Sequence, residues 1–349
     1  MNNLRLIAIG VLVFGLAGVI VLAVKNHIHL PIAPSSIEQK IISTPTNDNP
    51  LSIETMQKKS YPGSNLVIEQ TLQPGSNYDQ YIASYKSDNL KIYGLLTVPQ
   101  GTKPKNGWPV IIFNHGYIPP SVYKTTERYV AYVDAFARNG YIVFKSDYRG
   151  NGSSEGNPEG AYYSPAYAAD VLNALASLKQ YKDADPKRIG MWGHSMGGNI
   201  TLRSLVVDPK DIKAAVIWGG VVGSYDDLMN HWIRQVPFQP DPTQMALRNN
   251  YRSRLIKQYG TPQSNPTFWQ SIDPSFYFSE IAAPIQLHTG GLDEEVPVAF
   301  SQSLFEKLKK AGKVVQYYNY PGGDHNISSP NFELAMQRSI DFFDKYVKN

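Results

Sequence analysis

The sequence predicts an α/β fold with a mostly parallel sheet of about eight strands, and three observations support this. From residue 108 onward, short apolar strands alternate with helical segments, as in a parallel sheet that is buried on both faces. The composition, 42% hydrophobic and 12% aromatic over 349 residues, is sufficient for a large buried core. Residues 221–283 interrupt the alternation and are longer than the usual connections, so we expect an inserted element there.

The N-terminal segment, residues 1–25, is predicted to be a membrane anchor. Apart from Arg5 the run from Leu4 to Val24 is uncharged and apolar, and about 20 helical residues cross a hydrocarbon layer. A cleavable signal peptide is the alternative, because Val21-Leu22-Ala23 offers small residues before a cleavage point. The apolar region of a signal peptide is usually only about 7–15 residues long, which favours the anchor. We therefore expect a single-pass transmembrane helix with the C-terminal domain outside the cytoplasm.

Residues 26–60 are predicted to form a flexible linker, since they combine several prolines with Ser, Thr and Asn and show no sustained period. The domain is expected over residues 61–347. It begins with three alternating segments, LVIEQTL, YDQYIASYKS and LKIYGLLTVP, which are typical of antiparallel strands.

The alternation that follows assigns the remaining elements. The predicted strands are Val110–Asn114, Tyr141–Ser146, Arg188–Trp192, Lys213–Trp218, Pro284–Thr289 and Val314–Tyr320. The predicted helices are Thr126–Asn139, Ser164–Tyr181, Met196–Val207, Val298–Ala311 and Asn331–Val347.

The insert, residues 221–283, is predicted to form a few helices broken at prolines, and it contains several aromatic and arginine residues. Two interpretations stay open. It is either a subdomain with a small core of its own, or a lid whose aromatic and arginine side chains select the substrate. In the second case Trp232 and Arg234 are candidate substrate-binding residues.

A candidate nucleophile lies in the stretch Gly193-His194-Ser195-Met196-Gly197. Gly-x-Ser-x-Gly alone is weak evidence, because it occurs by chance in about one chain in ten of this length. Its position is more specific. It falls where an apolar strand ends and a helix begins, and a sharp turn at that point lifts the serine side chain off the sheet edge. Ser195 is therefore predicted to be a nucleophile.

A serine hydroxyl needs a base to take its proton and an acid to orient that base. The acid is expected after the strand that follows the insert, where Asp293 is the first carboxylate and precedes Glu294 and Glu295. The base is expected after the next strand, where His325 lies in a glycine-rich loop. Acyl transfer also needs donors for the oxyanion, and the backbone amides of Met196 and Tyr117 are the candidates.

Composition excludes other classes of function. The net charge is +4, yet Lys and Arg are scattered without a basic run, so nucleic-acid binding is not expected. The chain has no cysteine, which excludes a thiol nucleophile, disulfides and cysteine-bound metal. We expect no cofactor and no metal site.

From Trp108 to Val347 the chain resembles the α/β-hydrolases, and most of all the catalytic domain of the prolyl oligopeptidase family and its esterase relatives. FNHGY, GYIVFKSDYRGNGSSEG, RIGMWGHSMGG, GGLDEEVP and GGDHNI carry the resemblance. It implies a serine hydrolase that acts on peptide or small ester substrates.

Three functions follow from this resemblance as alternatives. The first is a serine peptidase, and the second is a carboxylesterase acting on small esters or acetylated sugars. The esterase is considered because the stretch before Trp108 is too short for the β-propeller of larger members, and because the insert is long. The third is a binding protein that uses the same fold without catalysis.

Overall fold

The computed structural model describes residues 49–237 and 242–349, and all of them belong to one unit of the chain. The strands are β1 Val67–Thr71, β2 Tyr78–Ser87, β3 Leu90–Pro99, β4 Trp108–Asn114, β5 Ile142–Ser146, β6 Ala184–His194, β7 Ala214–Trp218, β8 Ile285–Gly290 and β9 Val315–Tyr320. The helices are α1 Ile53–Lys58, α2 Val130–Arg138, α3 Ala166–Lys179, α4 Met196–Val207, α5 Pro242–Tyr259, α6 Pro266–Ile272, α7 Val298–Lys310 and α8 Phe332–Phe343.

The strands of the described residues form one nine-stranded sheet in the order β1-β2-β3-β5-β4-β6-β7-β8-β9. β1, β2 and β3 pair antiparallel and β3 joins β5 antiparallel, whereas β4 to β9 are all parallel. The predicted mostly parallel sheet with an antiparallel start is confirmed, with nine strands rather than about eight.

The topology also locates the functional edge. The chain runs outward from β4 to β5, then returns across β4 to continue with β6. In open α/β sheets, ligands bind beyond the carboxyl ends of the strands at such a reversal. The loops that follow β4 and β6 are therefore the expected position of the site.

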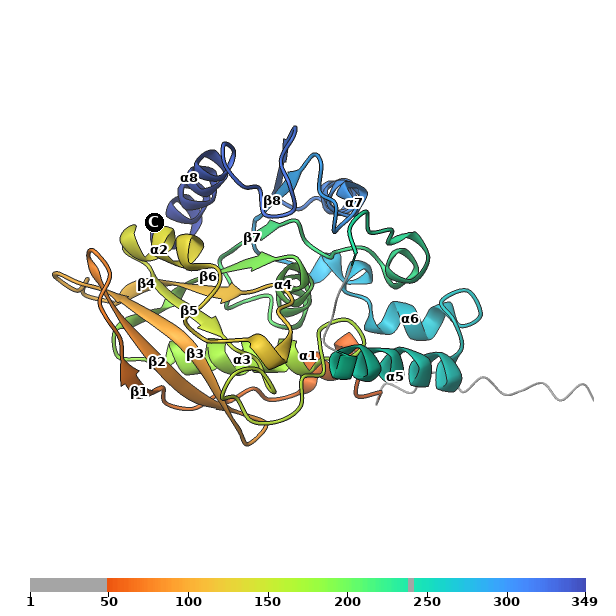
Figure 1. Cartoon of the computed structure of the whole chain (residues 1–349), viewed down its shortest axis with the longest axis horizontal. Helices are drawn as coiled ribbons and strands as arrows, with labels where there is room; N and C mark the ends of the chain where they lie inside the picture. Colours follow the sequence, from red (N-terminus) through yellow and green to blue (C-terminus); the bar gives the residue numbers. More distant parts are fainter. Residues whose placement is uncertain (1–48, 238–241) are drawn as a thin grey trace, which may run out of the picture. The chain divides into compact units, whose positions relative to one another are not determined.

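Two helical layers cover the parallel strands. Helices α3, α4 and α7 pack on one face, and α2 and α8 pack on the other (Figure 1). Successive residues of β4 show the division, because Ile112 belongs to the first core while Ile111 and Phe113 belong to the second. Burial on both faces explains why the central strands are largely apolar.

The N-terminal boundary of the domain differs from the prediction. Helix α1 lies within the segment predicted to be a linker, residues 26–60, and its Ile53 and Met56 are buried in the core. Ser52 caps the helix by accepting a hydrogen bond from the Thr55 amide. The predicted anchor, residues 1–25, lies outside the described residues. Among residues 49–237 and 242–349, no helix is long and apolar enough to cross a membrane.

The insert lies between β7 and β8 and contains α5 and α6, which lie next to each other on the right of the molecule in Figure 1, away from β1. Two of the prolines at which helices of the insert were expected to break, Pro242 and Pro266, are the first residues of α5 and α6. Proline is favoured at the first helical position, because the N–H that it lacks has no partner there and its φ is already helical.

Candidate active site

Ser195 occupies the sharp turn between β6 and α4. Its backbone has φ +55° and ψ −119°, a strained conformation for a residue other than glycine. Hydrogen bonds hold it from both sides: its N–H donates to the Trp218 carbonyl at 3.0 Å, and its carbonyl accepts from the amides of Gly198 and Val221, each at 3.0 Å. This is the geometry of a nucleophile elbow, which keeps the serine side chain at the edge of the sheet.

A glycine after the serine is required by close packing. A Cβ at position 197 would lie 1.8 Å from the Asn114 carbonyl oxygen at the end of β4. The elbow can therefore rest directly on the neighbouring strand only when residue 197 has no side chain.

The structure brings Asp293 and His325 into direct contact. Both side chains are almost fully buried, and Nδ1 of His325 lies 2.8 Å from Oδ2 of Asp293. The other carboxylate oxygen, Oδ1, accepts the amides of Glu295 at 2.9 Å and Val296 at 2.8 Å. Because an ionised carboxylate only accepts, Nδ1 carries the proton and Nε2 of the neutral imidazole is left as an acceptor.

Ser195 and His325 line one cleft of about 780 Å³, together with the predicted oxyanion donors Tyr117 and Met196. Met196 is the first residue of α4, so its N–H belongs to the helix terminus, where amides lack partners within the helix. Tyr117 follows Gly116 in the loop after β4. The cleft thus lies at the reversal point of the sheet.

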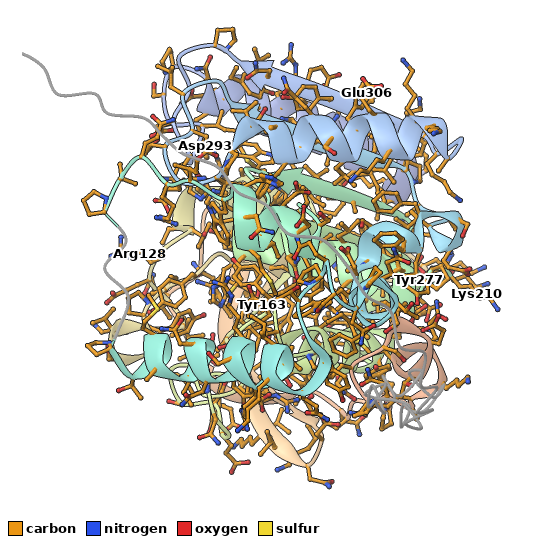
Figure 2. The ribbon with its side chains drawn as sticks, turned by 90° about the vertical axis from the view of Figure 1, so that its right-hand side faces the viewer. Arg128, Tyr163, Lys210, Tyr277, Asp293 and Glu306 are labelled. Atoms are coloured by element: carbon orange, nitrogen blue, oxygen red, sulfur yellow. The ribbon has the colours of Figure 1, made fainter. Side chains whose placement is uncertain are left out.

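Other parts of the cleft wall come from separate segments of the chain. Tyr162 and Tyr163 contribute to it, as do Met245, Asn249 and Arg252 of α5. Figure 2 shows Tyr163 just above α5, with Asp293 higher up next to α7. The insert therefore lines the cleft, while its Phe268 and Trp269 are buried in the core. Because these two residues join the main core of the domain, they do not form the separate core of a subdomain, and the interpretation of the insert as a lid stays a prediction.

Trp232 and Arg234, the predicted substrate-binding residues, also line the cleft. Both are tied to the loop that follows Asp293: Trp232 Nε1 donates to the Glu295 carbonyl at 2.8 Å, and Arg234 pairs with the Glu295 carboxylate at 2.7 Å. A backbone bond from Gln235 to the Glu294 carbonyl, at 2.8 Å, completes the connection. We call these contacts the insert clasp.

Tyr129 and His194 are also among the cleft residues that the sequence did not single out. Tyr129 was placed inside the predicted helix Thr126–Asn139, but α2 begins only at Val130 and Tyr129 has a left-handed backbone. No periodicity signals such a turn. His194 lies in the elbow motif, where only its position next to Ser195 could have drawn attention to it.

The fold and the strand-to-helix serine define the class of protein: the chain has the α/β-hydrolase fold and is a serine hydrolase. Residues 128–349 match the model of the prolyl oligopeptidase family, and the chain belongs to this family.

Known relatives and structures include peptidases and esterases. The uncharacterized peptidase YtmA of Bacillus subtilis is 28% identical, over 72% of this chain and 88% of its own length. The acylaminoacyl peptidase of Pyrococcus horikoshii has a TM-score of 0.62 at 22% identity, over 78% of this chain and 42% of its own. Est1E of Butyrivibrio proteoclasticus, solved with ferulic acid, has a TM-score of 0.58 at 19% identity, over 76% of this chain and 99% of its own. The chain thus spans most of YtmA and Est1E but less than half of the acylaminoacyl peptidase.

Proposed function

We propose that the protein cleaves short peptides through a Ser195–His325–Asp293 triad and an acyl-enzyme. The observation that carries this proposal is the 2.8 Å hydrogen bond between His325 and Asp293 beside the cleft that holds Ser195 at its elbow. It leaves Nε2 of His325 as the base for the Ser195 hydroxyl.

The proposed reaction proceeds in two halves. His325 takes the proton of Ser195 as Oγ attacks the substrate carbonyl, and the amides of Met196 and Tyr117 stabilise the resulting oxyanion. The protonated His325 then gives its proton to the leaving amine, which departs and leaves the acyl-enzyme. Water, activated by His325 in the same way, releases the acid and regenerates Ser195.

The size of the substrate follows from the walls of the cleft. Between residues 49 and 107 the structure has only α1 and three strands of the main sheet, so no propeller covers the cleft in this part of the chain. Instead α5 and the clasped segment of the insert bound it. A cleft of about 780 Å³ accommodates a short peptide or a small ester.

A carboxylesterase is the second candidate. In its favour, the matched region takes in nearly the whole of Est1E and of the Pyrococcus furiosus esterase PF2001, 99% of each chain, at 19% identity. These proteins resemble this chain without a second large domain. The same triad would serve, with an alcohol in place of the amine as the leaving group.

The test begins with a fluorophosphonate probe, which should label the wild-type protein and Ser328→Ala but not Ser195→Ala. Ser328 lines the same cleft and is therefore a matched control for a serine exposed to the probe. Steady-state rates on aminoacyl anilides and p-nitrophenyl esters then distinguish the two candidates. Unlabelled wild-type protein, or labelling that survives in Ser195→Ala, would refute the proposed nucleophile.

We also propose that the apolar run Leu4 to Val24 anchors the enzyme in a membrane, with the catalytic domain outside the cytoplasm. The full-length protein should stay in the membrane pellet after alkaline extraction, whereas a chain that starts at residue 26 should not. A soluble mature protein that has lost these residues would support the signal peptide instead.

A further inference from the structure

Two consecutive residues before α2 have an unusual backbone. Arg128 has φ +58° and Tyr129 φ +56°, so neither has the ordinary conformation of a residue with a side chain. Such strain persists only where the surroundings hold the chain in place. Here the fully buried Lys145 of β5 donates to the carbonyls of Glu127 at 2.9 Å and Arg128 at 3.3 Å.

The strained turn places the Tyr129 hydroxyl between two segments of the active site. Its oxygen accepts the Gly116 amide at 2.9 Å and lies 2.7 Å from Nδ1 of His194. A Cβ at position 116 would lie 2.6 Å from that oxygen, so the contact requires glycine. The His325 carbonyl can only accept, so the proton of the neutral His194 ring lies on Nε2, which faces that carbonyl at 3.1 Å. Nδ1 of His194 is therefore an acceptor, and the Tyr129 hydroxyl donates to it.

The two hydrogen bonds of His194 fit a single tautomer of the neutral ring. With Nδ1 as acceptor, the ring proton is on Nε2, which donates to the His325 carbonyl at 3.1 Å. Burial, and to a lesser degree the neighbouring His325, lowers the pKa of His194 to about 3, so the ring stays neutral. We call the chain Gly116–Tyr129–His194–His325 the relay.

The relay connects the three segments that acyl transfer must hold in register. Gly116 precedes the oxyanion donor Tyr117, His194 precedes Ser195, and His325 is the base. A displacement of about 1 Å in such a site can lower the rate about 100-fold. None of these hydrogen bonds involves a side-chain atom of Ser195 or the imidazole nitrogens of His325. The relay therefore affects where Ser195 and His325 lie, and not their proton transfer.

We propose that Tyr129 and His194 are positioning residues, which hold the oxyanion loop and the backbone of the His325 loop at a fixed distance from Ser195. This inference rests on the proposed function. Neither Tyr129 nor His194 needs to contact the substrate in order to act in this way.

The first variant to test is Tyr129→Phe, which removes one oxygen atom. We expect kcat to fall about 10- to 100-fold with KM within about twofold, and labelling of Ser195 by the fluorophosphonate to slow by a similar factor. Tyr141→Phe is the matched control. Tyr141 is a fully buried tyrosine whose hydroxyl donates to Asp344 at 2.7 Å, away from the cleft, and its loss should leave kcat unchanged.

A second pair of variants tests His194 separately. His194→Gln retains a donor at about the position of Nε2 and should keep most of the activity, whereas His194→Leu should lose as much as Tyr129→Phe. Because both residues act through one chain of bonds, the double variant Tyr129→Phe/His194→Leu should lose no more than either single variant.

The outcomes separate this inference from the proposed function. Wild-type protein that is not labelled at Ser195 would refute the triad itself. If labelling is normal but Tyr129→Phe and His194→Leu both keep kcat within about twofold, or if Tyr141→Phe loses as much activity, the relay is overturned and the triad stands. Losses confined to KM would likewise overturn it.

Discussion

Asp293→Asn is expected to lower kcat about 10,000-fold while the protein stays folded. The reason is the set of hydrogen bonds that the Asp293 carboxylate accepts. Oδ1 accepts the amides of Glu295 and Val296, and Oδ2 faces Nδ1 of His325. Asparagine has one oxygen and one NH₂ group. The two amides require the oxygen on their side, since the reverse orientation would leave both N–H groups unpaired, at about 1–3 kcal/mol for the buried amide of Val296 alone.

The NH₂ group of the asparagine therefore faces His325 and forces its Nδ1 to accept. The imidazole proton then moves to Nε2, which can no longer take the proton of Ser195. A 10,000-fold loss corresponds to about 5.5 kcal/mol of activation free energy, at about 1.36 kcal/mol per factor of ten.

The assay is steady-state hydrolysis of a p-nitrophenyl ester, with urea unfolding of each variant to confirm the fold. Glu294→Gln is the control, because it makes the same chemical change one residue away and leaves the Glu294 carbonyl free to accept from Gln235. Glu295 is unsuitable, since its carboxylate belongs to the insert clasp. Asp293→Asn with more than about a tenth of wild-type kcat, or a crippled Glu294→Gln, would refute the reasoning.

Three further outcomes are expected. Ser195→Gly and Ser195→Ala should both lose about a million-fold in kcat. In urea unfolding, Ser195→Gly should have a free energy of unfolding about 1 kcal/mol higher than Ser195→Ala, because glycine adopts φ +55° without strain. Equal stability of the two variants would contradict the strain. Burial lowers the pKa of both His115 and His194 to about 3. As the pH falls below 6.5, the unfolded chain therefore binds protons at these two histidines that the folded chain does not, and each histidine should lower the free energy of unfolding by up to about 1.4 kcal/mol per pH unit. Burial raises the pKa of Asp147 to about 6, which offsets about one histidine below pH 6, so the net fall is that of about one histidine; urea titrations at pH 6.5 and 5 that agree would contradict this. Breaking the insert clasp with Arg234→Gln or Glu295→Gln should change the ratio of kcat/KM between an anilide and an ester substrate, while the rate of labelling by a small fluorophosphonate stays within about twofold of wild type. If labelling is lost and the ratio of kcat/KM is unchanged, the clasp supports the fold instead of selecting the substrate.

Much of the fold could be predicted, because its signal is local. Burial on both faces makes the parallel strands largely apolar, and helices α2, α7 and α8 bury one face each, as the 3.6-residue period predicts. Boundaries were less predictable. Helix α2 starts at Val130 rather than Thr126, because a buried lysine from β5 holds residues 127 and 128 in a turn. Helix α1 was missed since its burial depends on residues far along the chain.

The candidate residues of the site divide in the same way. Ser195, Asp293 and His325 could be named because each follows a strand, and the carboxyl ends of parallel strands meet at one edge. Arg234 and Glu295 could not be paired from the sequence, because their contact joins the insert to a loop 61 residues later. A charge pattern along the chain contains no information about such distances.

The sequence by itself determined the alternation of strands and helices from residue 108 onward, the serine at the end of β6, and the candidate acid and base after β8 and β9. These depend on periodicity and on which residue ends a strand, and both are local properties. Only the tertiary structure decided that Tyr129 lies between Gly116 and His194, and that the insert is clasped to the loop after Asp293. The reason is physical: a hydrogen bond between distant segments depends on where packing places their backbones to within a few tenths of an ångström, and local preferences do not set that position.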